Sequence, residues 1–195
     1  MNRLMLAALI LSLAAPALSQ DVIEPKSGAA FAARDGDASL LGAGLRTRTI
    51  ARVKVYAIGL YVEDAALAGS LKGKAGTPEL YRELVNGDFH KKIVMKFLRN
   101  VTAEQVRDAF RESLKGAGGN TEAWTLYFGD TRSGQEYAIA WTPGVGLQTK
   151  VAGVDKPALN DKALAAAVFA IWLGAKPIQD DIKKDLVARC PGLLK

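Results

Sequence analysis

The stretch from Leu40 to Asp64 constrains the fold of this chain more than any other part of the sequence. It reads LLGAGLRTRTIARVKVYAIGLYVED, and apolar residues alternate with polar or small ones over Thr47–Ile50 and again over Val53–Val62. Such alternation, with many β-branched and aromatic side chains in the second segment, favours strands that are half-buried in a sheet. We therefore expect a glycine turn at Gly42–Gly44 that leads into two strands.

The first nineteen residues have the pattern of a secretory signal peptide. Arg3 precedes an apolar core from Leu4 to Ala15, which is too short to span a membrane, and small residues follow up to Ser19. Cleavage after Ser19 would leave residues 20–195, which we expect to form a single domain. No later apolar run reaches the length of a membrane span. We therefore expect a periplasmic protein without stable membrane insertion.

Residue counts exclude several kinds of site. The single cysteine, Cys190, cannot form a disulfide within the chain, and the single histidine, His90, cannot build a multi-histidine metal site. The formal net charge of +6 is modest and spread along the chain, which does not indicate a nucleic-acid surface. The sequence contains no GxSxG, no HExxH and no phosphate-binding glycine loop with a lysine. We predict no metal, no cofactor and no nucleic-acid partner, and we expect a monomer.

Hydrophobic periodicity predicts an α+β fold in which helices cover one face of an antiparallel sheet. Further strands are expected around Phe31, over Lys92–Leu98 and in a hairpin over Glu136–Val151. Helices are expected where a capping residue precedes apolar positions at helical spacing. The predicted helices span residues 77–86, 102–115, 160–174 and 179–188, whereas the pattern of residues 121–134 does not distinguish helix from strand.

Two residues of the opening stretch do not suit a plain strand: Arg46 lies beside the glycines, and Tyr56 lies within the apolar run. If both side chains face the interior, the guanidinium needs an anionic partner, because burying an unpaired charge is unfavourable. A planar set of donors beside a phenolic hydroxyl could then bind a carboxylate. Alternatively, Arg46 caps a turn or pairs with Glu63, and Tyr56 is an ordinary core residue. The residues alone leave both interpretations open.

The same stretch resembles the chalcone isomerase fold family. LGAGLRTRTI and KVYAIGLYVED resemble the LGxGxR turn and the AIGxYxE strand of that family, and MKFLRNVTAEQVRDAF and AVFAIWLGAKPI extend the resemblance to about Leu186. The resemblance implies an open-faced β-sandwich, in which helices pack over one face of a large antiparallel sheet and leave a ligand cleft between them. The family includes plant isomerases that close a flavanone ring, fatty-acid-binding proteins and exported bacterial proteins.

The resemblance also implies roles for individual residues. Arg46 matches the arginine that serves the isomerase reaction and holds the carboxylate in the fatty-acid binders, and Tyr56 matches a carboxylate-binding tyrosine of the binders. Val106 stands where the isomerases carry a catalytic tyrosine, and Ser113 stands at a following asparagine position. We therefore predict a non-catalytic binder of a hydrophobic carboxylate, such as a fatty acid, with its head group at Arg46 and Tyr56. Its apolar tail is predicted to contact Phe97, Val106, Phe110 and Trp172.

Two other functions stay open. The protein could be an isomerase or lyase for a chalcone-like or enone substrate, with Arg46 stabilising an oxyanion and Tyr56 as proton partner. The missing tyrosine at Val106 argues against that reaction, and no catalytic residue is assigned. The protein could also be a haem-binding module, with a tyrosine or His90 as axial ligand.

Overall fold

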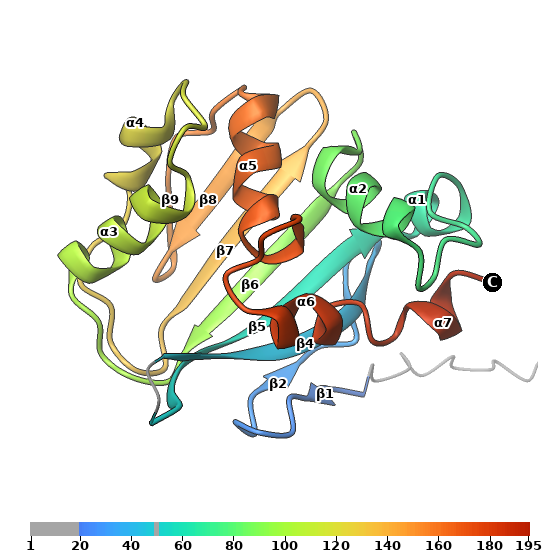
Figure 1. Ribbon diagram of the computed structural model, residues 1–195, viewed down its shortest axis with the longest axis horizontal. Helices are drawn as coiled ribbons and strands as arrows, with labels where there is room; N and C mark the ends of the chain where they lie inside the picture. Colours follow the sequence, from blue (N-terminus) through green and yellow to red (C-terminus); the bar gives the residue numbers. More distant parts are fainter. Residues whose placement is uncertain (1–19, 49–50) are drawn as a thin grey trace, which may run out of the picture.

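A seven-stranded antiparallel sheet forms the centre of the protein (Figure 1). The computed structural model describes residues 20–48 and 51–195. The strands lie in the order β3-β4-β5-β6-β7-β8-β9, so that each one pairs with its neighbours in the sequence. Their bounds are β3 Arg34–Asp35, β4 Ala38–Arg48, β5 Val53–Glu63, β6 Lys91–Phe97, β7 Glu136–Thr142, β8 Gly146–Val151 and β9 Val154–Asp155.

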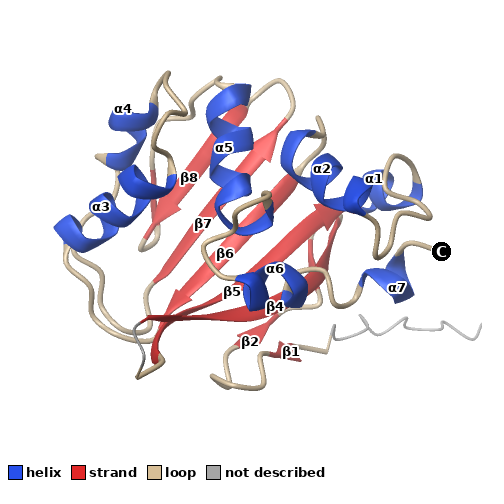
Figure 2. Cartoon of the chain, in the orientation of Figure 1, coloured by secondary structure: helices blue, strands red, loops and turns tan. Residues whose placement is uncertain are grey.

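Helices cover one face of this sheet (Figure 2). They are α1 Asp64–Ala68, α2 Pro78–Asn86, α3 Ala103–Ser113, α4 Thr121–Thr125, α5 Lys162–Leu173, α6 Asp180–Asp185 and α7 Cys190–Leu193. A two-stranded ribbon, β1 Val22–Ile23 and β2 Ala30–Phe31, packs on the opposite face of β4 and β5 through Phe31, which contacts Gly59. The arrangement confirms the predicted α+β fold, an open-faced β-sandwich with helices on one face.

The alternating strands place their apolar side chains against the helices. Along β6, Lys91, Ile93, Met95 and Phe97 are buried, and the residues between them are half-buried. The helix α5 is apolar almost all round, and its Trp172 is fully buried in the same core. A helix of this composition is expected where it lies between a sheet and other helices. The helical layer and the sheet therefore share one main hydrophobic core.

The predicted turn at Gly42–Gly44 is wrong, because both glycines lie inside β4, a strand of 11 residues. A Cβ atom at Gly42 would collide with the carbonyl oxygen of Asp185, and one at Gly44 would lie 3.1 Å from the Asp185 Cβ. The absence of side chains lets α6 lie directly on β4, a close approach that glycine permits. The glycines therefore serve helix packing rather than chain reversal.

Most other predicted elements are confirmed within a few residues. Thr102 and Gln105 form the capping box that begins α3, and the predicted hairpin is formed by β7 and β8. The ambiguous segment begins with the short helix α4, and the last predicted helix is shorter, ending at Asp185. The predicted signal peptide and residues 49–50 of the predicted strand lie outside the described residues. Within the described ranges, no helix combines the length and the apolar character needed to cross a membrane.

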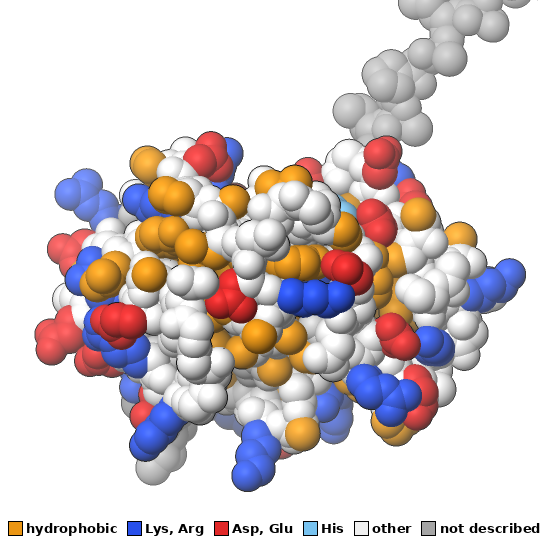
Figure 3. Space-filling view, turned by 90° about the horizontal axis from the view of Figure 1, so that it is seen from above, with side chains coloured by type: hydrophobic (Ala, Val, Ile, Leu, Met, Phe, Trp, Pro, Cys, Tyr) orange, Lys and Arg blue, Asp and Glu red, His pale blue; other side chains and the backbone are white. Residues whose placement is uncertain are grey.

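Charged side chains on the surface are largely mixed in sign. Figure 3 shows the end of the molecule at the top of Figure 1, where lysine and arginine side chains are interspersed with acidic and hydrophobic ones. Over the surface as a whole, several cations pair with carboxylates, as in Lys92 with Asp35 at 2.6 Å and Lys162 with Asp88 at 3.0 Å. Exposed pairs of this kind contribute little to stability.

Candidate functional site

A cavity of about 630 Å³ lies between the sheet, α3 and α5. This volume falls within the usual range of small-molecule sites. All six residues predicted from the sequence line it: Arg46, Tyr56, Phe97, Val106, Phe110 and Trp172. They come from β4, β5, β6, α3 and α5, so the tertiary structure brings together positions from most of the chain.

Arg46 and Tyr56 are direct partners across the β4–β5 pair. Directly opposed residues of an antiparallel pair project from the same face, so both side chains face the helical layer. The pairing becomes irregular between Arg46 and Thr47, which leaves Val55 without a partner in the strand register. Val55 also lines the cavity. The local irregularity thus lies at the edge of the candidate head-group site, where bulges commonly redirect side chains.

Gln179, which precedes α6, holds one side of the Arg46 guanidinium. Arg46 Nη1 donates to Gln179 Oε1 at 3.2 Å and to the carbonyl oxygen of Thr47 at 2.7 Å. Gln179 Oε1 also accepts from the Thr47 backbone N at 3.1 Å, and Gln179 Nε2 donates to the Leu45 carbonyl oxygen at 3.2 Å. Gln179 therefore links α6 to β4 on both sides of Arg46. Nothing in the sequence pattern indicated this residue.

Arg46 has no carboxylate partner among the described residues. The alternative of an ion pair with Glu63 is wrong, because Glu63 lies at the far end of β5, opposite Ala38. The guanidinium is half-buried, and Nη1 alone makes its described hydrogen bonds. A guanidinium carries five N–H donors, so the remaining donors are available to an anion in the cavity.

Tyr56 is buried, with 8% of its surface exposed, and its hydroxyl accepts a hydrogen bond from Trp172 Nε1 at 3.0 Å. Burial raises the pKa of Tyr56, outweighing the Trp172 hydrogen bond and the charge of Arg46, which lower the same pKa. The hydroxyl is therefore protonated at neutral pH. Trp172 was predicted only as an apolar wall, and the structure adds a polar role that the sequence did not indicate.

The remaining walls of the cavity are mainly apolar. Met95 and Phe97 contribute from β6, Val106 and Phe110 from α3, and Ile171 from α5. Aromatic contacts support these walls: the Phe97 ring lies 5.7 Å from the Tyr56 ring, and Phe110 packs against Trp124 and Phe128 at centroid distances of 4.9 and 4.6 Å. An apolar chain would therefore meet side chains whose positions are set by the core.

Hydrogen bonds and an ion pair to residues 122–130 hold helix α3 in place. Ala103 N donates to Asp130 Oδ1 at 2.8 Å, Arg107 Nε donates to the Phe128 carbonyl oxygen at 2.7 Å, and Arg111 pairs with Glu122 at 2.6 Å. Polar residues of α3, namely Gln105, Asp108, Glu112 and Ser113, line the cavity together with Arg48 and Arg99. The site therefore combines an apolar interior with a charged rim.

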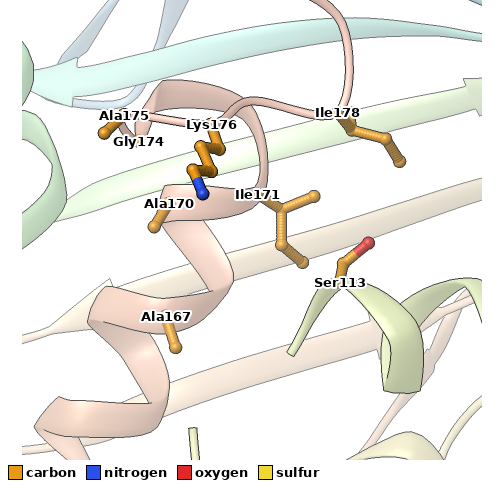
Figure 4. A pocket seen from close by; sticks show the side chains of 8 residues that line it. All are labelled: Ser113, Ala167, Ala170, Ile171, Gly174, Ala175, Lys176 and Ile178. Atoms are coloured by element: carbon orange, nitrogen blue, oxygen red, sulfur yellow. The ribbon is translucent and has the colours of Figure 1, made fainter. Parts of the chain in front are cut away.

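A smaller space of about 230 Å³ adjoins this cavity beside α5. Figure 4 shows Ala167, Ala170 and Ile171 along α5, with Ser113 at the end of α3 close by. Ser113, Ile171 and Ile178 line both spaces. The two spaces are thus neighbours that share part of their lining.

Sequence comparison identifies the family to which this fold and site belong. A profile of the chalcone isomerase-like family matches residues 27–188. The chain belongs to the chalcone isomerase-like family. A member named chalcone isomerase-like protein 1, from Humulus lupulus, is 30% identical over 176 residues, covering 78% of this chain and 82% of the relative.

Other relatives in the chalcone isomerase-like family carry names of two functional kinds. A chalcone–flavanone isomerase of Phaseolus vulgaris is 27% identical and covers 78% of this chain and 82% of its own length. Fatty-acid-binding protein 1 of Arabidopsis thaliana is 24% identical, and the match covers 89% of this chain and 72% of that protein. A crystal structure of an Arabidopsis thaliana fatty-acid binding protein superimposes with a TM-score of 0.76 at 20% identity, covering 90% of this chain and 99% of that one. This likeness confirms the chalcone isomerase-like fold.

Val106 and Ser113 are the two helix positions at which the sequence resemblance predicts isomerase side chains to be missing. Val106 lines the cavity with 7% of its surface exposed, and Ser113 Oγ donates to the Ala109 carbonyl oxygen at 2.8 Å. Tyr56 is the only tyrosine among the described residues that line the cavity. No hydroxyl is therefore presented from the Val106 position of α3.

Other titratable residues singled out in the sequence lie elsewhere. His90 precedes β6 and its Nδ1 lies 2.9 Å from Thr142 Oγ1, and neither residue lines the cavity. Cys190 is the buried first residue of α7, and burial raises its pKa to about 12. The described residues include no group of three or more His, Cys, Asp or Glu side chains that could hold a metal ion.

Proposed function

We propose that this protein binds a fatty acid, or another hydrophobic carboxylate, without catalysing a reaction. One observation carries the proposal: Arg46 lacks a carboxylate partner among the described residues, and it lies opposite Tyr56 in a largely apolar cavity of about 630 Å³. Two donors at one end of an apolar cavity suit an acyl chain with an ionised head group. The occurrence of a protein named fatty-acid-binding among the relatives supports the proposal.

The expected energetics assign different roles to the two parts of the site. Burial of an acyl chain contributes about 0.8 kcal/mol for each methylene removed from water, so the apolar walls supply most of the affinity. A hydrogen bond to a charged group contributes about 1.5–3 kcal/mol, which Arg46 and Tyr56 would direct to one end of the ligand. The head group thus sets the orientation of the ligand, and chain length sets most of the affinity.

The isomerase alternative is favoured by the relatives named chalcone–flavanone isomerase. It requires a group that positions water or shares a proton beside the reacting oxygen. Val106 cannot serve in that way, and burial raises the pKa of Tyr56, so its protonated hydroxyl cannot act as a base at neutral pH. Binding without turnover is therefore the better match to this cavity, and assays with chalcone substrates are expected to show no rate above the uncatalysed reaction.

We also propose that the protein works in the periplasm as a monomer. The support for export is the pattern of residues 1–19, a short basic start followed by an apolar core and small residues. Fractionation of the native host would test this directly. A precursor of full length in the cytosol, with no shorter form in the periplasm, would contradict export, and light scattering of the purified protein would test the oligomeric state.

To test binding, the protein is purified from its native compartment, bound lipids are extracted from it with solvent, and the released lipids are identified by mass spectrometry. Fatty-acid affinity is then compared between wild type and Arg46→Ala by calorimetry. We expect co-purified fatty acid and a loss of affinity of about tenfold or more, the effect of removing a hydrogen-bonded charge. Arg82→Ala is the matched control, because Arg82 is exposed on α2 and pairs with Glu79 at 3.6 Å. Absence of bound lipid together with equal affinities would refute the proposal.

A further inference from the structure

We propose that Trp172 makes Tyr56 an obligate hydrogen-bond donor and thereby selects carboxylates over primary amides at the head-group site. The inference rests on the proposed function, since it assumes that a ligand head group lies beside Arg46 and Tyr56. Trp172 is a positioning residue in this account, because it acts on the head group through the Tyr56 hydroxyl.

The direction of the Trp172–Tyr56 hydrogen bond is fixed by chemistry. An indole N–H can only donate, so the Tyr56 hydroxyl must be the acceptor at the observed distance of 3.0 Å. The hydrogen of the hydroxyl then points elsewhere. Among the hydrogen bonds of the described residues, none uses that hydrogen, and Tyr56 lines the cavity. The hydroxyl therefore presents a donor to whatever occupies the cavity.

Burial makes this donor role difficult to reverse. Trp172 is 0% exposed and Tyr56 is 8% exposed, so their hydrogen bond is shielded from bulk water. The hydroxyl could accept from a ligand only by turning its hydrogen away from the cavity. The ligand and the buried indole N–H would then compete for the same hydroxyl oxygen. Leaving a buried donor unpaired is unfavourable. Burial also raises the pKa of Tyr56, so the hydrogen is retained at neutral pH.

The second donor of the site is Arg46, whose guanidinium has no acceptor. A carboxylate offers two acceptor oxygens and can meet both Arg46 and Tyr56. A primary amide offers one neutral oxygen and an NH₂ group, so Arg46 and Tyr56 either share that single oxygen or one of them faces another donor. Without the Trp172 hydrogen bond, the Tyr56 hydroxyl could turn and accept from that NH₂ group. Trp172 should therefore affect the discrimination between the two head groups more than the affinity for the shared acyl chain.

Calorimetry with dodecanoate and dodecanamide, two ligands with the same acyl chain, tests this inference. The ratio of the two affinities is measured in wild type, Trp172→Phe, Tyr56→Phe and the double variant. We expect Trp172→Phe to reduce the preference for dodecanoate about tenfold, the size of one hydrogen bond to a charged group. In the Tyr56→Phe background the same change should have little further effect on the ratio, because the two residues act as a unit.

Trp141→Phe is the matched control. Trp141 is 4% exposed and its Nε1 donates to Asp88 Oδ1 at 3.0 Å, away from the cavity, so its removal should leave the ratio unchanged.

A second measurement does not depend on the folding of Trp172→Phe. In the ligand-free protein, Tyr56→Phe should shift one indole N–H resonance in a ¹⁵N–¹H spectrum, whereas Trp141→Phe removes a different one.

The outcomes separate this inference from the proposed function. An unchanged affinity ratio in folded Trp172→Phe, or unshifted indole resonances in Tyr56→Phe, would overturn the role of Trp172 even if dodecanoate binds and Arg46→Ala weakens that binding. If wild type does not bind dodecanoate at all, the proposed function and the inference both fail. A reduced ratio with a shifted resonance would support both.

Discussion

Gln179 Oε1 lies 3.2 Å from Arg46 Nη1, although 133 positions separate the two residues in the sequence. The same oxygen accepts from the Thr47 backbone N at 3.1 Å. This neutral acceptor orients the guanidinium while leaving its charge available. A carboxylate in the same place would pair with Arg46 and take the position that we assign to the ligand.

Gln179→Glu is therefore expected to weaken fatty-acid binding by about tenfold, because the new carboxylate competes for the guanidinium. Displacement of a fluorescent fatty acid measures the change. Gln148→Glu introduces the same charge on the exposed side of β8 and should have no effect. Equal affinities of Gln179→Glu and wild type would contradict the assignment of Arg46 as the head-group anchor.

Gly42→Ala tests the packing of α6 on β4. The added methyl group would collide with the backbone of Asp185 and Leu186, so we expect a loss of about 1–3 kcal/mol in the free energy of unfolding, as for other overpacked sites. Urea denaturation gives this value. Gly129→Ala is the control, because a Cβ there meets nothing within 4 Å, and its effect should stay within about 0.5 kcal/mol. A neutral Gly42→Ala would show that α6 can move away from β4 without loss.

Val106 should tolerate a larger side chain better than a core valine does. Val106→Phe fills the cavity, so we expect reduced affinity for long acyl chains with a change in stability below about 1 kcal/mol. Val168→Phe places the same side chain in the closed core of α5 and should destabilise the protein by about 1–3 kcal/mol. Chemical denaturation and fatty-acid titration of both variants make the comparison. Similar destabilisation by both would mean that the space beside Val106 is not open to a ligand.

Lys91 is a buried cation whose effect on stability depends on pH. It is 2% exposed and donates to the carbonyl oxygens of Leu84, Val85 and Gly87 at 2.8, 2.9 and 3.1 Å, at the end of α2. Burial, followed by repulsion from Lys162, lowers its pKa from the ordinary value of 10.5 to about 8. Between these values the unfolded chain binds a proton that the folded protein releases. The free energy of unfolding contributed by this group therefore rises with pH over that interval.

Lys91→Met removes this dependence. The free energy of unfolding of wild type minus that of Lys91→Met should rise by roughly 1 kcal/mol from pH 8 to pH 9. The same difference should change little below pH 7. Urea denaturation at a series of pH values measures it, and the raised pKa values of Cys190 and Tyr61 cancel in the difference. A difference that stays constant across pH 7–9 would show that Lys91 has an ordinary pKa in the folded protein.

The sequence by itself determined the elements whose causes are local. Alternation placed β5 and β6, and the capping box of Thr102 and Gln105 placed the start of α3. Inward alternation also accounts for the position of Phe97 in the cavity, and helical spacing accounts for Phe110. Motif resemblance added the expectation that Arg46 and Tyr56 lie together. These features depend on neighbours only a few positions away, so the local pattern contains them.

Only the tertiary structure decided which distant groups complete the site. Gly42 and Gly44 suggest a turn in isolation, but they lie under α6, whose residues come about 140 positions later in the chain. That packing brings Gln179 to Arg46, and the packing of α5 brings Trp172 Nε1 to the Tyr56 hydroxyl. A hydrogen bond depends on distances and angles between two specific atoms, and no local periodicity specifies them for residues so far apart. The sequence therefore indicated the proposed anchor, Arg46 and Tyr56, whereas the orientation of these side chains follows from the way α5 and α6 pack on the sheet.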